Sequence, residues 1–594
     1  MALVPVKING KIYEVEQGIS ILAACRSVGI EIPTLCYLKD INEIGACRIC
    51  LVEVKGARTL VAACVYPIDP PKPDRVTGEL MPMEIRTNSA SVIASRRMTL
   101  ELILSTHNRS CLSCVRSGTC ELQKLCQEYG IENETRFAGE VPPFTKDDSA
   151  VHMVRDNTKC ILCRRCSAVC AKYQHVGVIG ANDRGFKTHI GTAFEAGLGD
   201  VACVNCGQCI NYCPTGALHE KDQTQEVFDA IADPKKHVIV QTAPSVRVGL
   251  GEPFGMPIGT IVTGKMVTAL KMLGFDRVFD TNFAADLTIM EEATEFLERY
   301  TKKENLPLIT SCSPGWIKFC ETYFPDFIPN LSSCKSPQGM FGAVAKTYYA
   351  EKMGIDPKDI FVVSVMPCTA KKFEAERLDH TAVKGLPDID AVLTVRELAR
   401  MIKKAGILFN ELPDDTYDAP FGLGSGAGTI FGATGGVMEA ALRTAYETLT
   451  GETLEKLEFN EVRGTEGIKE ATYTIAGNVI RVAVCSGTAN AKKLLTMIRN
   501  GEKDYDFVEI MACPGGCVNG GGQPIVDSDT RATVDVRAVR AKALYGEDAG
   551  KALRKSHENA EIKAIYADYL GKPGGHRSHE LLHTHYTRRE KYTD

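Results

Sequence analysis

The feature that most constrains this 594-residue chain is a duplicated cysteine motif in its first third. The segments "CILCRRCSAVC" and "CVNCGQCINYCP" share the spacing C-x2-C-x2-C-x3-C, and the second copy ends in proline. This spacing is typical of paired 4Fe-4S clusters, in which the fourth cysteine of each run ligates the other cluster. We therefore predict two cubanes with crossed ligands, one held by Cys160, Cys163, Cys166 and Cys213, the other by Cys203, Cys206, Cys209 and Cys170.

The composition also indicates metal chemistry. The chain has 24 cysteines, and clustered cysteines in a reducing compartment indicate metal or redox sites rather than disulfides. The formal net charge of -5 gives no sign of a nucleic-acid surface, and no apolar run has the length of a membrane span. We expect a cytoplasmic protein of about three to five domains with no nucleic-acid or membrane partner.

Another cysteine group lies near the N-terminus, after a predicted hairpin at Asn9-Gly10 and a helix in "GISILAACRSVG". This arrangement resembles plant-type ferredoxins and, in its spacing, the ferredoxin-like domain that begins the large iron–sulfur subunit of respiratory complex I. The resemblance implies one 2Fe-2S cluster, and zinc is the competing interpretation. The predicted ligands are Cys36, Cys47, Cys50 and Cys64.

The segment "HNRSCLSCVRSGTC" supplies three cysteines and a histidine, a set that fits structural zinc by count alone. It also resembles the His-ligated 4Fe-4S site that follows the same domain in complex I. Its position between two electron-transfer modules favours iron–sulfur and completes a relay of one 2Fe-2S and three 4Fe-4S clusters. The predicted ligands are His107, Cys111, Cys114 and Cys120.

Three further cysteine loops, "TSCSPGW", "MPCTAKKFE" and "ACPGGC", follow apolar runs that alternate with amphipathic helices. This pattern predicts α/β layers, in which ligand sites form at the carboxyl ends of the strands. The loops match the signature loops of FeFe hydrogenases. Their H-cluster joins a 4Fe-4S cubane to a two-iron unit that carries CO, cyanide and an azadithiolate.

The resemblance covers essentially the whole chain and implies reversible conversion of protons and electrons into H2. The expected fold is multidomain α+β and α/β, with ferredoxin-like iron–sulfur domains before an α/β catalytic domain. The expected divisions are a 2Fe-2S domain at 1–80, a His-ligated 4Fe-4S domain at 81–125, a two-cubane domain at 145–220, an H-cluster domain at 235–530 and its C-terminal tail region at 531–594.

The resemblance also implies roles for single residues. Cys368, Cys513 and Cys517 would ligate the H-cluster, Lys371 would contact a cyanide, and the glycines after Cys517 would make room for the inorganic group. Five residues are expected to line the two-iron unit: Ser245, Gln338, Met366, Phe431 and Met511. For the apolar ones among them, ordinary core packing is the alternative.

A proton path is expected along "IMEEATEFLERY", where Glu292, Glu295 and Arg299 share one helix face at i, i+3 and i+7. A solvated face with an ion pair is the alternative explanation. The family places a proton channel at these positions together with Ser332, and ionisable groups joined by a hydroxyl can pass protons.

One loop departs from the family pattern T-S-C-C-P. Here Cys312 takes the position of the proton-relaying cysteine, and Ser313 takes that of the cubane ligand. Cys312 is therefore a candidate for either role: relay in the gap-free alignment, or ligand if the loop shifts.

Two features have no place in this scheme. "HELLH" contains His579 and His583 in the H-E-x-x-H pattern of zinc proteases, but we interpret it as part of a C-terminal tail. The unassigned cysteines are expected to be small buried hydrophobic residues: Cys25, Cys126, Cys320, Cys334 and Cys485.

The complex I-like N-terminus predicts docking to an NADH-oxidising, FMN-containing flavoprotein and a thioredoxin-like iron–sulfur subunit, with ferredoxin as a further partner. A complex I-like electron carrier would leave the three C-terminal loops unexplained. A hydrogen sensor would usually carry a signalling domain, and none is recognised in the sequence.

Overall fold

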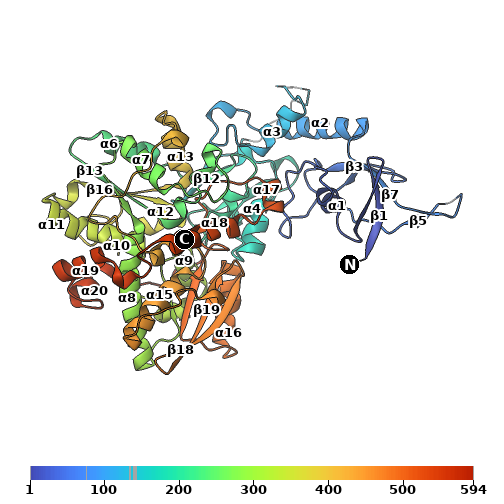
Figure 1. The fold of residues 1–594 in the computed structure, drawn as a ribbon. Helices are drawn as coiled ribbons and strands as arrows, with labels where there is room; N and C mark the ends of the chain where they lie inside the picture. The colour runs from blue at the N-terminus through green and yellow to red at the C-terminus, as the bar shows by residue number, and fades with distance from the viewer. Residues whose placement is uncertain (1, 75, 133–135, 138–142, 593–594) are drawn as a thin grey trace.

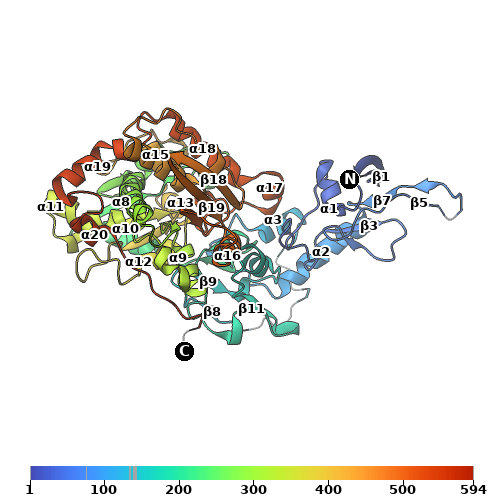
Figure 2. The same ribbon diagram turned by 90° about the horizontal axis from the view of Figure 1, so that it is seen from below.

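The computed structural model describes residues 2–74, 76–132, 136–137 and 143–592. A small N-terminal module, blue in Figure 1, projects from one side of a larger C-terminal body, and the other cysteine-rich modules lie between them (Figures 1 and 2). Among the described helices, none combines the length and the hydrophobicity needed to cross a membrane.

The N-terminal module is a five-stranded sheet in the order β2-β1-β7-β3-β4, packed with helix α1 (Ile21–Ser27). Asn9 and Gly10 have φ values of 48° and 89°, as a two-residue hairpin turn requires, which confirms the predicted hairpin. Strand β7 pairs with β1, so this sheet continues past the expected boundary at residue 80. The strands are β1 (Leu3–Ile8), β2 (Lys11–Glu16), β3 (Leu51–Val54), β4 (Val61–Ala62), β7 (Met83–Arg86) and the separate pair β5 (Lys72–Pro73) and β6 (Leu80–Met81).

The two middle modules are small. Helices α2 (Ala90–Ser105) and α3 (Glu121–Glu128) flank the second cysteine group. Each copy of the duplicated motif contains one short helix, and the residues that precede these helices, Arg164 and Gly207, have positive φ values of 59° and 66°. The module of the duplicated motif consists of α4 (Arg165–Ala168), α5 (Gln208–Asn211), a sheet of β8 (Lys146–Asp147), β9 (Met153–Asp156) and β12 (Leu218–Glu220), and the pair β10 (Gly180–Asn182) and β11 (His189–Gly191).

Two four-stranded sheets form the core of the C-terminal body. One is parallel throughout, in the order β14-β13-β16-β17, and in the other, β15-β20-β19-β18, only the β18–β19 pair is antiparallel. Most of their strands are buried apolar runs, as expected for sheets covered by helices. They are β13 (His237–Thr242), β14 (Arg277–Asp280), β15 (Leu308–Ile309), β16 (Ile360–Met366), β17 (Ala391–Thr394), β18 (Ile468–Ile475), β19 (Asn478–Ser486) and β20 (Phe507–Met511).

The longest helix, α8 (Thr281–Lys302), starts directly after β14 and contacts α10, α14 and α15. Its N-cap Asp280 accepts a hydrogen bond from the Asn282 backbone, which fixes where the helix begins. The other helices are α6 (Thr224–Ala232), α7 (Thr263–Leu273), α9 (Pro314–Tyr323), α10 (Pro337–Val344), α11 (Ala350–Met353), α12 (Ala370–Ala375), α13 (Val395–Lys404), α14 (Gly426–Ile430), α15 (Gly436–Thr450), α16 (Thr488–Arg499), α17 (Ser528–Thr533), α18 (Val536–Gly550), α19 (Ala560–Ile565) and α20 (His576–Leu582).

A buried ionic network ties α15 to α18. The Arg443 guanidinium donates to Glu439 at 2.6 Å and to both oxygens of Asp548 at 2.8 and 2.9 Å, and all three residues are fully buried. Losing one partner of such a network is costly because the remaining charges stay in a dry environment.

Arg443→Met is therefore expected to destabilise the C-terminal body by about 3 kcal/mol. The midpoint of thermal unfolding measures this. The control is Arg499→Met, because the ion pair of Arg499 with Asp326 is about half exposed and should contribute about 0–1 kcal/mol. Equal midpoints for the two variants would contradict the role of the network.

Candidate active site and metal centres

A buried cavity lies where the strands of the two sheets end. It is lined by residues that follow β13, β14 and β15 and by the ends of β16 and β20. The cavity brings together every residue expected to line the two-iron unit, together with Lys371 and three of the four cysteines expected at the H-cluster. These lining residues are Ser245, Cys312, Gln338, Met366, Cys368, Lys371, Phe431, Met511 and Cys517.

The residues of this cavity fit an inorganic group with polar ligands. The walls are mostly apolar, yet Ser245 Oγ and Gln338 Oε1 are buried there without a hydrogen-bond partner in the described part of the chain. Buried polar atoms are normally paired, so two unpaired ones on one cavity indicate a bound partner. Lys371 adds a cation, and its Nζ donates to Ser336 at 2.7 Å and Glu374 at 2.6 Å.

The cysteines at this site are soft donors in a dry environment. Burial raises the pKa of Cys517 to about 12, and it also raises the pKa of Cys368. Burial raises the pKa of Cys513 further, and nearby charges on Cys368, Cys206 and Cys517 add to the effect. Thiols in this setting lose their protons when a metal cluster supplies compensating positive charge.

The glycines after Cys517 have a different role from the expected one. A Cβ on Gly520 would lie 2.1 Å from the Pro367 carbonyl oxygen, and one on Gly521 would lie 2.2 Å from the Cys206 carbonyl oxygen. These glycines therefore let three cysteine-bearing loops pack backbone against backbone. The expectation that they make room for the inorganic group is corrected accordingly.

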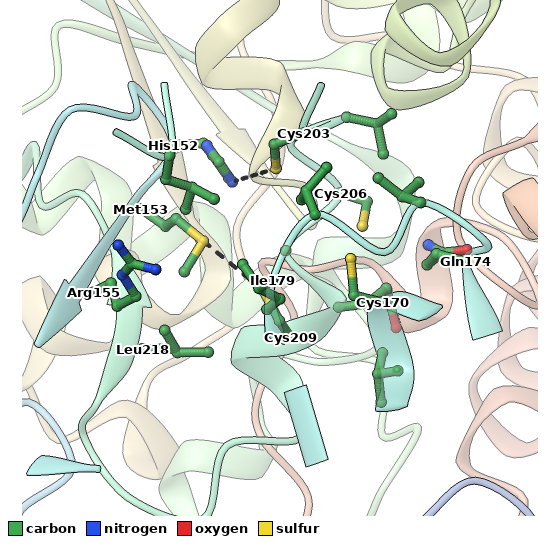
Figure 3. Close-up of a pocket in the computed structure, with 17 residues that line it drawn as sticks. His152, Met153, Arg155, Cys170, Gln174, Ile179, Cys203, Cys206, Cys209 and Leu218 are labelled. Carbon is green, nitrogen blue, oxygen red and sulfur yellow. Dashed lines mark hydrogen bonds between the residues drawn. The ribbon is translucent and has the colours of Figure 1, made fainter. Parts of the chain in front are cut away.

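Figure 3 shows the pocket formed by the second run of the duplicated motif. Its lining includes Cys203, Cys206 and Cys209 together with Cys170 from the first run, which is the crossed grouping expected for this spacing. His152 is fully buried beside this group, with Nε2 3.9 Å from Cys203 Sγ.

The first run of the motif has its own group of thiols. Burial raises the pKa of Cys166, and charges on Cys160 and Cys213 raise it further, which indicates that these sulfurs are close together. Burial likewise raises the pKa of Cys163, with smaller effects from Cys166 and Cys213.

The His107 ring is half-buried and lies near the charged groups of Lys159, Asp156 and Arg109. Burial lowers its pKa to about 4, and its Nδ1 has no hydrogen-bond partner among the described residues. A neutral imidazole with a free nitrogen can act as a metal ligand. Cys114 of the same group packs so closely on Gly216 that a Cβ there would lie 2.6 Å from its Sγ, and Cys111 and Cys120 are partly buried.

The four N-terminal cysteines also converge. Hydrogen bonds from Cys47 and Cys64 lower the pKa of Cys36, and Cys50 interacts with Cys64 in the same way. Thiols that lie close enough to hydrogen-bond and to shift one another's pKa are suitable ligands for one shared metal cluster.

The expected proton-path residues lie together on and beside α8. Glu295 accepts hydrogen bonds from Arg299 at 2.7 Å and from the Ser332 hydroxyl at 2.8 Å. Glu292 is fully buried, and burial together with the charge of Glu295 raises its pKa to about 8. Burial raises the pKa of Cys312, which lines the cavity, and the nearby charge of Glu292 adds to the effect.

The structure separates the environments of Cys312 and Ser313. Cys312 lines the cavity, whereas Ser313 Oγ accepts a hydrogen bond at 3.1 Å from the backbone of Ala512, the residue before Cys513. Sequence reasoning missed Ser336 and Glu374, which hold Lys371 in place. The i, i+3 spacing of Lys371 and Glu374 was a signal that could have identified the latter.

Comparisons with known families match almost every module. Residues 236–521 match the C-terminal domain of the iron-only hydrogenase large subunit, and residues 534–589 match the iron hydrogenase small subunit. Residues 2–71 match a 2Fe-2S cluster binding domain, residues 96–135 the NADH-ubiquinone oxidoreductase-G iron–sulfur binding region, and residues 159–217 a 4Fe-4S dicluster domain.

The chain is 49% identical to the NADP-reducing hydrogenase subunit HndD of Solidesulfovibrio fructosivorans, with 100% of both chains covered. It is 45% identical to iron hydrogenase 1 of Clostridium pasteurianum, covering 98% of this chain and 99% of that protein. A solved FeFe-hydrogenase HydA1 structure from Chlamydomonas reinhardtii has a TM-score of 0.56 and 46% identity over 62% of this chain and 99% of that one. The chain therefore belongs to the FeFe hydrogenases, as a multi-cluster member whose reaction is the reversible conversion of protons and electrons into H2.

Proposed function

We propose that Cys368, Cys513 and Cys517 hold the H-cluster, and that Glu295, Ser332, Glu292 and Cys312 carry protons to it. The observation that supports this most is the convergence of three distant cysteine loops on one cavity that contains unpaired polar atoms. When bound, the H-cluster supplies the redox chemistry, and the protein supplies ligation, orientation and proton routes.

Hydrogen bonds support the outer part of the proposed proton route, and burial supports its inner part. A proton on Glu295 can pass to the Ser332 hydroxyl, which donates to Oε2 of that carboxylate. Glu292 comes next: its carboxylate oxygens are buried without a hydrogen-bond partner among the described residues, and its pKa of about 8 lets it hold a proton near neutral pH. The thiol of Cys312 is the last proton carrier before the cavity. Arg299 orients Glu295, because a guanidinium keeps its own protons.

Lys371 acts as a fixed cation at the cavity wall. Its bonds to Ser336 and Glu374 hold the ammonium in one position, and its charge favours an anionic ligand such as cyanide. Ser245 and Gln338 offer their unpaired atoms from other walls, while Met366, Phe431 and Met511 exclude water.

We assign Cys312 as the proton relay and Ser313 as the residue at the fourth cubane position. Two observations support this assignment: Cys312 lies on the cavity beside Glu292, and Ser313 lies beside the loop of Cys513. An oxygen ligand, or a water, would then complete the cubane.

Electrons are proposed to pass through one 2Fe-2S and three 4Fe-4S clusters. The Asn42 side chain donates to the carbonyls of Cys36 and Cys163 at 2.7 and 3.0 Å, which joins the 2Fe-2S loop to the first cubane loop. Arg116 donates to the Cys213 carbonyl at 3.3 Å, which connects the His107 module to the same cubane. The loop that would hold the second cubane contacts the loop after Cys517 through the hydrogen bond from Gln208 to the Asn519 carbonyl at 2.8 Å.

The proposed partners follow from the modules and from one relative. Because HndD is described as a subunit of an NADP-reducing hydrogenase, we propose that this chain also works within a multi-subunit complex that uses a nicotinamide. An FMN-containing flavoprotein and a thioredoxin-like protein would dock at the complex I-like modules, with ferredoxin as a further partner. A cytoplasmic location suits the 24 cysteines, none of which forms a disulfide.

Glu295→Gln is expected to keep every cluster and lose turnover about 100-fold or more, because an amide cannot carry a proton by ionising. Hydrogen evolution with reduced viologen, on protein carrying the matured cofactor, measures the effect. The control is Glu298→Gln on the same helix, because Glu298 is exposed and its contact is with Lys302. Wild-type turnover in Glu295→Gln would return this residue to a structural ion pair.

Cys312→Ser is expected to keep the iron content and the H-cluster infrared bands while stopping turnover, because a serine hydroxyl is a much weaker acid than a thiol. Ser313→Cys, which restores the family pattern, should keep turnover and change the magnetic signature of the cubane. Loss of the cubane in Cys312→Ser would instead show that Cys312 is the ligand.

Iron analysis tests the cluster count. We expect about 18 iron atoms per chain in the cubanes and the 2Fe-2S cluster, and about 20 once the two-iron unit is installed. Zinc should be absent from pure protein. One zinc per chain, with about four irons fewer, would mean that the His107 site holds zinc.

A further inference from the structure

A second set of contacts reaches Glu295 from the C-terminal segment. Cys334 and His583 form an isolated β-bridge, and the Thr584 backbone N–H donates to the Ser333 carbonyl at 2.7 Å. This backbone pairing fixes the imidazole of His583 beside the Ser333 hydroxyl. His583 is the last residue of "HELLH", so this C-terminal segment pairs through its backbone with the loop that carries Ser333 and Cys334.

The side chains then form a continuous chain of hydrogen-bonding groups. Ser333 Oγ lies 3.1 Å from Glu295 Oε1 and 2.8 Å from His583 Nδ1. His583 Nε2 lies 3.0 Å from Glu291 Oε2, and the hydroxyl of Tyr566 also donates to this buried carboxylate. The Ser333 hydroxyl has one proton and two acceptors, so it can point either way.

Most of the other groups around the Glu295 carboxylate cannot deliver a proton to it. The Arg299 guanidinium and the backbone N–H of Ser333 keep their protons. The Cys334 thiol, 3.7 Å away, is fully buried, and Ser332 leads inward. In the described part of the chain, the remaining sources are the Ser333 hydroxyl and water that reaches the 13% exposed Glu295 side chain directly.

The outer end of the chain lies near the surface. The His583 side chain is 4% exposed, and its ring stacks on that of exposed His579, with centroids 4.4 Å and planes 11° apart. An imidazole takes up a proton at one nitrogen and releases one from the other. Glu291 faces Nε2 and can stabilise the protonated ring while it exists.

We propose that His583 is a second proton entrance, which meets the route from solvent at Glu295. The inference rests on the proposed role of Glu295. Inward, the Nδ1 proton of a protonated His583 moves to Ser333 Oγ as the Ser333 hydroxyl proton moves to Glu295 Oε1. An imidazolium and a carboxylate become a neutral imidazole, which keeps its Nε2 proton facing Glu291, and a carboxylic acid. Water then returns a proton to the ring, and the reverse sequence exports protons during H2 oxidation.

His583→Gln tests the proposal in the holoenzyme. A glutamine can hydrogen-bond but cannot carry the proton, so turnover should fall about fivefold, less than a complete loss of acid–base relay because water still reaches Glu295. The solvent deuterium isotope effect on turnover should rise. Imidazole added to His583→Ala should restore turnover, which a purely structural role would not produce. His585→Gln, an exposed histidine two residues on, is the control and should match wild type.

Combining His583→Gln with Glu295→Gln distinguishes a failure of the second entrance from a failure of the proposed relay through Glu295. Because His583 acts through Glu295, adding His583→Gln to Glu295→Gln should cause no further loss. Unchanged infrared bands and iron content in His583→Gln exclude damage to the clusters. An inactive Glu295→Gln with wild-type turnover and isotope effect in His583→Gln would overturn the second entrance alone. An active Glu295→Gln would overturn the relay itself.

Discussion

Burial of sulfur is the constraint on which the rest of this structure depends. Burial raises the pKa of thiols such as Cys209 and Cys513 well above the ordinary range, so they become ligands only when a cluster replaces their protons. The ligand loops also support one another, because Gly521 lies on the Cys206 backbone. Cluster loading and the packing of the C-terminal body against the relay are therefore coupled.

The contacts that hold the modules together also connect the loops of neighbouring cluster sites along the proposed electron route. Asn42 connects the loop of the 2Fe-2S site to a cubane loop. Arg165, 1% exposed within the first cubane run, pairs with Glu121 of the His107 module and contacts Ser528 of the C-terminal body. A buried cation shared among three modules fixes their spacing, which electron transfer between clusters requires.

Burial also shifts the pKa of a carboxyl group on the proposed proton route. Burial holds the pKa of Glu292 at about 8, while Glu295 stays ion-paired at the rim of the protein. On helix α8, Glu295 accepts hydrogen bonds from Ser332 and Ser333, whereas Glu291 faces His583 of the C-terminal segment. One helix thus carries both carboxylates of the proposed relay and the group that faces the proposed second entrance.

The sequence by itself determined the features that depend on local spacing: the Asn9-Gly10 hairpin, the crossed grouping of Cys170 with the second cysteine run, and the three loops at strand ends. Short motifs constrain backbone geometry within a few residues, so the hairpin and the loops could be predicted, and the crossed grouping follows from the repeated spacing, in which the fourth cysteine of each run ligates the other cluster. Only the tertiary structure decided the packing role of Gly520 and the position of His583 beside Ser333. Those contacts join residues 153 and 250 positions apart, and no local pattern specifies which distant backbone will occupy the neighbouring space.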